Sequence, residues 1–228
     1  MITSDVLGRV FCLKIGDSTA TGFAIDVENK QYIVTARHFA INLADNAPLQ
    51  VLFENKWHNL GGKLVGHANG EIDISVLTLG GIASNPDLQL TPDQAIIYGQ
   101  DVYFLGFPYN SWGDSETAFS GRPIPFVRKA IVSCIESGPN GEHRNFLDGH
   151  NVPGFSGGPV VYSLNPPYNF KVTSVISGYR FIEQPVYIGK EKTDATVQYN
   201  TGIIITYGIR HALDIIKLNP IGVQIKKQ

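Results

Sequence analysis

The stretch Gly154-Phe155-Ser156-Gly157-Gly158-Pro159 surrounds one serine with three glycines. Glycine loses more backbone freedom on folding than any other residue, so this density indicates a backbone that must approach a partner closely. Acyl transfer requires such a turn, because the serine oxygen attacks a carbonyl while nearby backbone N–H groups bind the oxyanion that forms. The stretch predicts Ser156 as a nucleophile, with the N–H groups of Gly154 and Ser156 as the oxyanion hole. A plain turn between two strands is the alternative.

Two upstream segments contain candidate partners for this serine. Tyr32 to His38 is a short, β-branched run that ends at a histidine, and Glu71 to Leu77 places Asp73 at the start of an alternating strand. A serine hydroxyl needs a base to take its proton, and the base needs a group that holds its ring. We interpret His38 as the general base and acid, and Asp73 as the orienting group. A structural histidine and a turn aspartate are the alternative interpretations.

The chain order is His38, Asp73, Ser156, within the motifs Thr-Ala-x-His, Asp-Ile-x-Val-Leu and Gly-x-Ser-Gly-Gly-Pro. This combination resembles the trypsin-like (chymotrypsin-fold) serine peptidases, and most of all their HtrA-type and related prokaryotic members. The resemblance extends from about Gly8 to Leu218. It implies a serine endopeptidase that forms an acyl-enzyme on Ser156, acts on peptides or proteins, and uses no cofactor.

The expected fold class is all-β, with two six-stranded antiparallel β-barrels followed by a C-terminal α-helix. Short alternating or β-branched runs separated by turn residues support it; the predicted strands are Val10 to Ile15, Ala20 to Asp26, Gln31 to Thr35, Gln50 to Phe53, Lys63 to His67, Ile74 to Leu79, Asp101 to Gly106, Phe126 to Glu136, Asn145 to Leu147, Pro159 to Tyr162, Phe170 to Gly178 and Thr201 to Tyr207. Apolar residues at helical spacing predict a helix face; these are Ile209, Ala212, Leu213 and Ile216.

We divide the chain into an N-terminal lobe (residues 1–79, with His38 and Asp73), a linker (80–98), and a C-terminal lobe (99–228, with Ser156 and the helix). Two connections, Pro108 to Pro125 and Arg180 to Asn200, are too long for hairpin turns and are interpreted as functional or mobile loops.

Composition narrows the function classes. The net charge is −2 and no basic run stands out before the last residues, which argues against nucleic-acid binding. No apolar stretch approaches 18 residues and no secretory signal is visible, so we expect no membrane span and a cytoplasmic location. Cys12 and Cys134 lie in apolar runs and are predicted to be buried free thiols. No metal-ligand spacing is present, so no metal is expected.

The resemblance also suggests where substrate binds. It implies a primary pocket lined by the residues before the nucleophile and by the strand from Val175 to Gly178, which gives His150, Ser177 and Gly178 as candidate substrate-binding residues. No aspartate stands at His150, so a strong preference for Lys or Arg before the cut is not expected.

Two features depart from the family pattern. Phe155 replaces the aspartate that pairs with a freed N-terminal amine in the digestive branch, so activation by trimming is not expected; instead Phe155 is predicted to pack into the second lobe. Arg37 is bulkier than the usual residue before the histidine.

Three other interpretations fit parts of the sequence. Gly-x-Ser-x-Gly followed by Asp194 and His211 also fits an α/β-hydrolase, although a strand rather than a helix should follow Ser156. A catalytically silent trypsin-fold module that binds peptides or regulates a partner is the main alternative. The sequence also leaves open whether the chain is part of, or held inactive by, a larger protein.

Overall fold

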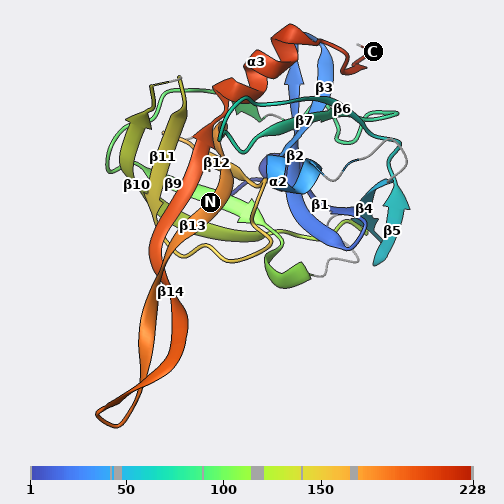
Figure 1. The fold of residues 1–228 in the computed structure, drawn as a ribbon. Helices are drawn as coiled ribbons and strands as arrows, with labels where there is room; N and C mark the ends of the chain where they lie inside the picture. Colours follow the sequence, from blue (N-terminus) through green and yellow to red (C-terminus); the bar gives the residue numbers. More distant parts are fainter. Residues whose placement is uncertain are drawn as a thin grey trace.

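The computed structural model describes residues 2–41, 43, 48–88, 90–113, 121–139, 141–164 and 169–226. Two β-sheets, antiparallel except for the pairing of β8 with β13, make up most of it, with few and short helices (Figure 1). The first sheet, with the early strands, lies beside the second, and a long hairpin projects from the second sheet alone. The all-β fold class of the trypsin-like type is confirmed.

The first sheet has the strand order β5-β4-β1-β2-β3-β7-β6. Its strands are β1 (Val10–Ile15), β2 (Ser18–Val27), β3 (Lys30–Thr35), β4 (Leu49–Phe53), β5 (Lys56–Asn59), β6 (Lys63–His67) and β7 (Ser75–Thr78). Glu28 and Asn29 join β2 to β3 with φ values of 49° and 59°. Two positive φ angles give a turn whose twist matches that of the flanking strands. Two short helices, α1 (Ser4–Leu7) and α2 (Arg37–Ala40), flank this sheet.

The second sheet has the order β12-β9-β10-β11-β14-β13-β8, and an extra pairing of β12 with β13 closes six of its strands into a barrel. Its strands are β8 (Thr91–Pro92), β9 (Asp101–Gly106), β10 (Phe126–Ser137), β11 (His143–Asp148), β12 (Pro159–Tyr162), β13 (Lys171–Ile188) and β14 (Glu191–Gly208). A 3₁₀ turn, η1 (Pro108–Asn110), follows β9.

One buried apolar cluster joins the two sheets. It contains side chains of both, among them Phe23, Val34, Leu105 and Val161, all with no exposed surface. Because burial of apolar surface is the main favourable contribution to folding, this shared core holds the two sheets in a fixed relation. The groups contributed by each sheet to a site between them are therefore fixed relative to one another.

The C-terminal segment returns to the first sheet. The helix α3 (Arg210–Leu218) packs on β6. Of the apolar face predicted for it, Ala212 and Ile216 are buried and Leu213 is partly buried, while Ile209 is buried directly before the helix begins. Asn219 donates a hydrogen bond to the carbonyl of Val65 at 3.0 Å, and β15 (Val223–Gln224) pairs with β3. The chain after α3 thus contacts the first sheet. No helix in the described part of the chain is long and apolar enough to cross a bilayer.

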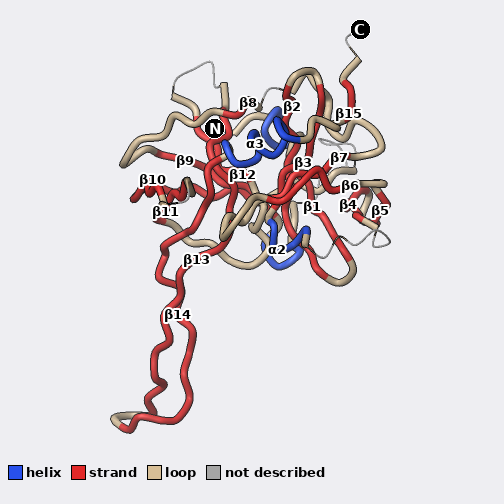
Figure 2. Tube along the Cα trace, turned by 45° about the horizontal axis from the view of Figure 1, so that its top comes forward, coloured by secondary structure: helices blue, strands red, loops and turns tan. Residues whose placement is uncertain are grey.

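The structure corrects two expectations. Arg180 to Asn200 is not a loop: β13 and β14 continue as a paired ribbon that extends beyond the rest of the molecule (Figures 1 and 2). Cys134 is exposed, because a bulge between Val132 and Cys134 breaks the inward alternation of β10. Cys12 is buried as predicted, and burial raises the pKa of its thiol to about 12.

The other long connection is only partly within the described residues. In this connection, Pro108 to Pro125, residues 114–120 lie outside the described residues. Its described part begins with η1, and an isolated bridge pairs Gly113 with Ile124.

Candidate active site

The glycines around Ser156 are required by their surroundings. Gly154 has φ of 103° and Gly157 has φ of 81°, a region that side chains disfavour. A Cβ atom on Gly154 would collide with the carbonyl of Phe107, and one on Gly157 with the carbonyl of Thr21. The turn therefore lies tightly against backbone of both sheets, as its glycine content predicts.

Thr21 of β2 anchors this turn from the first sheet. Its N–H donates to the carbonyl of Ser156 at 2.9 Å, and its hydroxyl donates to the carbonyl of Gly154 at 2.7 Å. The same hydroxyl accepts a bond from the N–H of Phe107 at 3.2 Å. Thr21 is fully buried. Sequence reasoning missed it, because nothing in the local pattern of β2 indicates a contact more than 130 residues away.

Phe155 packs into the second sheet as predicted. Its side chain has no exposed surface, and its ring meets that of Phe104 edge-on at 4.9 Å between centroids. Buried aromatic pairs of this geometry add to the stabilisation from burial alone. Phe155 thus holds the turn around Ser156 by apolar packing.

The structure brings His38 and Asp73 together at one end of the neighbouring strands β3 and β7 of the first sheet. His38 lies in α2 directly after β3, and Asp73 precedes β7, the neighbour of β3. The backbone N–H of His38 donates to one Asp73 oxygen at 2.8 Å, and the ring Nδ1 contacts the other at 2.7 Å. A carboxylate only accepts hydrogen bonds, so Nδ1 bears the proton, and in the neutral ring Nε2 has the free lone pair.

The two groups shift each other's ionisation. The hydrogen bond and charge of Asp73 raise the pKa of His38 above its ordinary value, against the effect of partial burial. Burial of Asp73 on its own would raise the pKa of that carboxyl, but the bonds from His38 and Ser177 outweigh it, so the pKa is lowered. Asp73 is therefore ionised at neutral pH and stabilises the protonated form of His38.

Ser177 of β13 links the serine to this pair. Its hydroxyl donates to the Asp73 oxygen that His38 also contacts, at 2.7 Å. Its carbonyl accepts the hydroxyl of Ser156 at 3.2 Å. Within the described residues no hydrogen bond joins Ser156 to His38. The resemblance suggested Ser177 as a substrate-binding residue. Its hydrogen bond to Asp73 is an addition from the structure, because no local sequence pattern around Ser177 predicts it.

The N–H groups of Gly154 and Ser156 donate no hydrogen bond within the described part of the chain. Both belong to the turn that Thr21 and Phe155 hold. Two unpaired donors beside a serine hydroxyl are what an oxyanion would need.

The predicted pocket residues lie around the start of the ribbon. His150 is exposed, and its carbonyl accepts a bond from Arg128 at 2.6 Å. Asn151, by contrast, is buried and donates its side-chain amide to the carbonyl of Gly178 at 3.0 Å. A Cβ added to Gly178 would meet no atom within 4 Å, so open space lies beside it. The structure thus places Asn151, rather than the His150 side chain, in contact with the strand at Gly178.

Arg37, which lacked an explanation in the sequence, contacts the loop that leads to Asp73. Its guanidinium donates to the carbonyls of Ala68 and Gly70 at 3.1 and 2.7 Å. It therefore ties α2, which carries His38, to the segment that carries Asp73.

The α/β-hydrolase alternative is wrong. Ser156 leads into β12 rather than a helix, and Asp194 lies on the exposed ribbon. His211 accepts a hydrogen bond from the backbone N–H of His143 at 3.0 Å, so it has a structural contact of its own.

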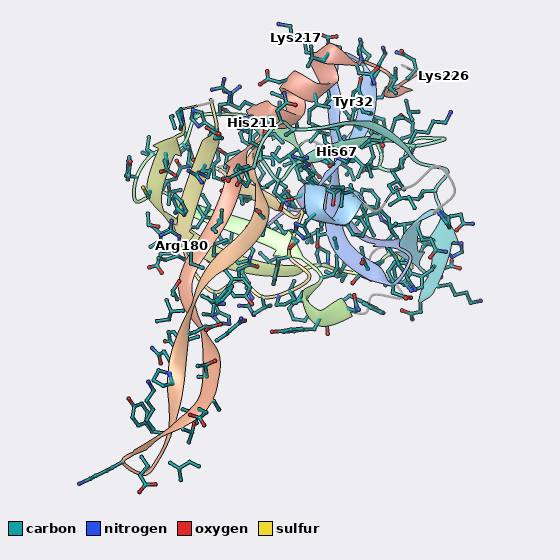
Figure 3. The ribbon with its side chains drawn as sticks, viewed as in Figure 1. Tyr32, His67, Arg180, His211, Lys217 and Lys226 are labelled. Carbon is teal, nitrogen blue, oxygen red and sulfur yellow. The ribbon has the colours of Figure 1, made fainter. Side chains whose placement is uncertain are left out.

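A separate hollow of about 410 Å³ lies between β6 and α3. His67 and His211 are in its wall, near α3 in Figure 3. Neither His38, Asp73 nor Ser156 lines it. Among the described residues, no group of three or more His, Cys, Asp or Glu side chains is placed to hold a metal ion.

The model of the trypsin-like peptidase domain family matches residues 20–165, which include His38, Asp73 and Ser156. No curated protein sequence matches the chain. The fold is similar to that of the Rv3671c protease in its inactive form, with a TM-score of 0.57 and 14% identity over 94% of this chain and 90% of that one.

It is also similar to the HtrA-type protease AlgW with a tripeptide, with a TM-score of 0.59 and 18% identity over 94% of this chain and 60% of that one. The chain therefore corresponds to somewhat more than half of the AlgW chain. Identities this low establish a common fold only. The family model, however, matches more than half of the sequence, and the protein therefore belongs to the trypsin-like peptidase domain family.

Proposed function

We propose that the protein is a serine endopeptidase that cuts peptide bonds through an acyl-enzyme on Ser156. The observation that carries the proposal is the position of Asp73. Its carboxylate accepts bonds from the backbone and ring of His38 and from Ser177, whose carbonyl in turn accepts the Ser156 hydroxyl. Base, orienting group and nucleophile thus meet at one place from two sheets. Peptides and proteins are the substrates of this family.

In this mechanism His38 takes the proton of Ser156 on Nε2 while the serine oxygen bonds to the carbonyl carbon. Asp73 stabilises the resulting imidazolium, and the N–H groups of Gly154 and Ser156 bind the oxyanion. His38 then gives the proton to the leaving amine, and water repeats the sequence to free the acid. The Ser156 hydroxyl must first turn from the carbonyl of Ser177 towards His38, and catalytic bonds of this kind often tighten only when substrate binds.

The test is the Ser156→Ala variant. Loss of the nucleophile should lower peptide hydrolysis on the order of 10⁴-fold or more and leave the fold unchanged. Ser137→Ala, an exposed serine at the end of β10, is the control and should keep full activity. A fluorophosphonate probe should label the wild-type chain and the control but not Ser156→Ala. Hydrolysis that survives in purified Ser156→Ala contradicts the proposal.

A catalytically silent peptide-binding or regulatory module is the second candidate. It is favoured by one observation: the Ser156 hydroxyl bonds to Ser177 rather than to His38. Such a module would bind peptides but fail to react with the fluorophosphonate probe. The cytoplasmic location, the division into lobes, and the absence of cofactor and nucleic acid remain predictions.

A further inference from the structure

We propose that the protein forms a dimer with a second copy of itself through one face of the ribbon (residues 180–200), with the two ribbons packed face to face and pointing in opposite directions. This inference goes beyond the proposed function and does not depend on it. The ribbon projects beyond the rest of the molecule in two views (Figures 1 and 2), and Arg180 lies at its base (Figure 3). No residue from Phe181 to Tyr199 is buried.

The pairing register shows which residues of the ribbon share a face. From Phe181 to Pro185 the pairing of β13 with β14 has no irregularity. Residues directly opposite each other lie on the same face, and successive residues of a strand lie on opposite faces. One face therefore contains the pairs Ile182 with Tyr199 and Gln184 with Val197, and the other contains Phe181 with Asn200, Glu183 with Gln198 and Pro185 with Thr196.

The two faces differ in polarity. Ile182, Val197 and Tyr199 lie on the first, which we call the apolar face, whereas the second consists mostly of polar residues. These three side chains are 47%, 53% and 57% exposed. None of them belongs to an apolar cluster in the described part of the molecule. The apolar face thus leaves in water the kind of surface whose burial drives association.

The length of the ribbon adds to the need for a partner. A two-stranded hairpin is marginally stable by itself in water, and it gains stability when one face packs against another element. The described part of the chain supplies no such element to the ribbon beyond its base, because its residues are exposed or only partly buried. A second molecule can supply it.

Charge and symmetry favour a second copy as this partner. Between positions 180 and 200 there are three basic and three acidic residues, so two ribbons can approach without net repulsion. A two-fold interface places the same surface of both copies in contact. The apolar face of one copy then covers the apolar face of the other, and both ribbons lose exposed apolar surface at once.

The position of the ribbon determines how two copies can meet. The ribbon leaves one side of a much wider body (Figures 1 and 2). Two ribbons packed in the same direction would bring the two bodies into collision at their bases. In opposite directions the bodies lie at opposite ends of the pair. Val197, opposite Gln184 near the middle of the ribbon, then lies close to the two-fold axis and to its own copy.

The contact area suits a reversible dimer. About ten residues in each strand at about 3.3 Å per residue give a length of about 30 Å, and two adjacent strands are about 10 Å wide. With the side chains of both copies, the area removed from water is roughly 1,000 Å², which is the lower limit for a specific interface. We therefore expect a dissociation constant in the micromolar range.

Association through the edges of the strands is less favourable. Pro185 has no N–H to donate, and register irregularities lie between Tyr179 and Phe181 and between Pro185 and Tyr187. Prolines and bulges are the features with which native sheets protect an exposed edge. The faces of the ribbon carry no such protection between Phe181 and Pro185.

The experiment measures the oligomeric state by sedimentation velocity, in Ser156→Ala so that self-cleavage cannot interfere, with wild type in parallel. The mass should change from monomer to dimer with a Kd on the order of 10 µM. Val197→Lys places a charge near the same charge of the partner and should raise this Kd at least about tenfold. Thr196→Lys adds the same charge to the neighbouring residue on the other face and should leave the Kd unchanged.

Cross-linking tests the arrangement of the two ribbons. Cys134 is exposed and is replaced by serine, whereas Cys12 is buried, with a thiol pKa of about 12, and should not react. In this background Val197→Cys should link to its own copy through a short bismaleimide, because packed sheets lie about 10 Å apart. Thr196→Cys points away from the partner and should not link. Urea unfolding should be the same for all variants, since both positions are exposed.

Three results would overturn the inference. One is a chain that stays monomeric up to hundreds of micromolar, which would leave the apolar face to a different protein. Another is a dimer that Val197→Lys and Thr196→Lys weaken equally, or that neither weakens, since the apolar face would then not be the interface. The third is a failure of Val197→Cys to link to its own copy. None of these results depends on peptide hydrolysis, so the proposed function is tested separately.

Discussion

Asp73 determines the proton affinity of His38 in this site. Its carboxylate contacts the ring Nδ1 at 2.7 Å and raises the pKa of His38, while partial burial acts in the opposite direction. Only the neutral ring can accept the Ser156 proton. The pH dependence of hydrolysis should therefore report the His38–Asp73 contact directly.

The first residue-scale prediction concerns this pH dependence. In wild type, kcat/KM should rise with pH as His38 loses its proton, with a midpoint above the ordinary value of 6.5. Asp73→Asn removes the charge, so the midpoint should move to lower pH and kcat should fall by about 10⁴-fold. Glu71→Gln, exposed and two residues away, is the control. An unchanged midpoint in Asp73→Asn would show that Asp73 does not act on the catalytic base.

The second residue-scale prediction concerns Gly178. Its backbone is outside the left-handed region and its missing side chain leaves open space, so Gly178→Val should change the free energy of unfolding by less than about 0.5 kcal/mol. The added methyl groups should nevertheless obstruct substrate and raise KM at least about tenfold. Gly81→Val, which also meets open space, is the control. An unchanged KM would remove Gly178 from the substrate site.

At the scale of elements, α2 and the segment before β7 act as one unit because Arg37 joins them. The helix has only four residues and no side-chain cap, so its own hydrogen bonds hold it weakly. The two bonds from Arg37 to the carbonyls of Ala68 and Gly70 hold α2 against the segment that precedes β7. We therefore expect Arg37 to help keep the His38 ring at its contact distance from Asp73.

Arg37→Met should therefore lower kcat by roughly tenfold with a smaller change in KM, since hydrogen bonds from a charged group contribute about 1.5–3 kcal/mol. Arg37→Lys can still reach one carbonyl and should recover part of the loss. Titration of His38 by NMR gives an independent readout: its pKa should fall in Arg37→Met as the contact with Asp73 loosens. A normal His38 titration with normal kcat would argue against a positioning role.

At the scale of the whole molecule, the site exists only because the two sheets meet. His38 and Asp73 belong to the first sheet, Ser156 and Ser177 to the second, and Thr21 bonds across the junction to the turn around Ser156. The shared apolar core fixes the distance between the two sheets. The hydrogen bonds of Thr21 fix the orientation of the turn around Ser156 relative to the first sheet.

Thr21→Val keeps the shape of this side chain but removes its hydroxyl. The partly buried carbonyl of Gly154 and the buried N–H of Phe107 lose a partner, so the free energy of unfolding should fall by about 2 kcal/mol. The rate of fluorophosphonate labelling of Ser156 should fall as well. Thr196→Val, exposed on the ribbon, is the control for urea unfolding. Wild-type stability and labelling in Thr21→Val would show that the core alone positions the turn.

Much of this architecture could be predicted from the sequence by itself. Strands with one buried face alternate with period two, and glycines at positive φ mark the turn at Ser156, so both patterns are local. The motif order also indicated which histidine and which aspartate to pair with the serine. The structure bears out the fold class and brings His38 to Asp73.

Tertiary structure alone decided the rest, because those features depend on contacts distant in sequence. Neither face of the ribbon is buried, so Arg180 to Asn200 has no regular apolar alternation and was predicted as a loop. The bonds of Thr21 with Gly154, of Arg37 with Ala68 and of Ser177 with Asp73 join residues that are 133, 31 and 104 positions apart. Periodicity shows which face of a strand is buried, but not which distant carbonyl or carboxylate that face will meet.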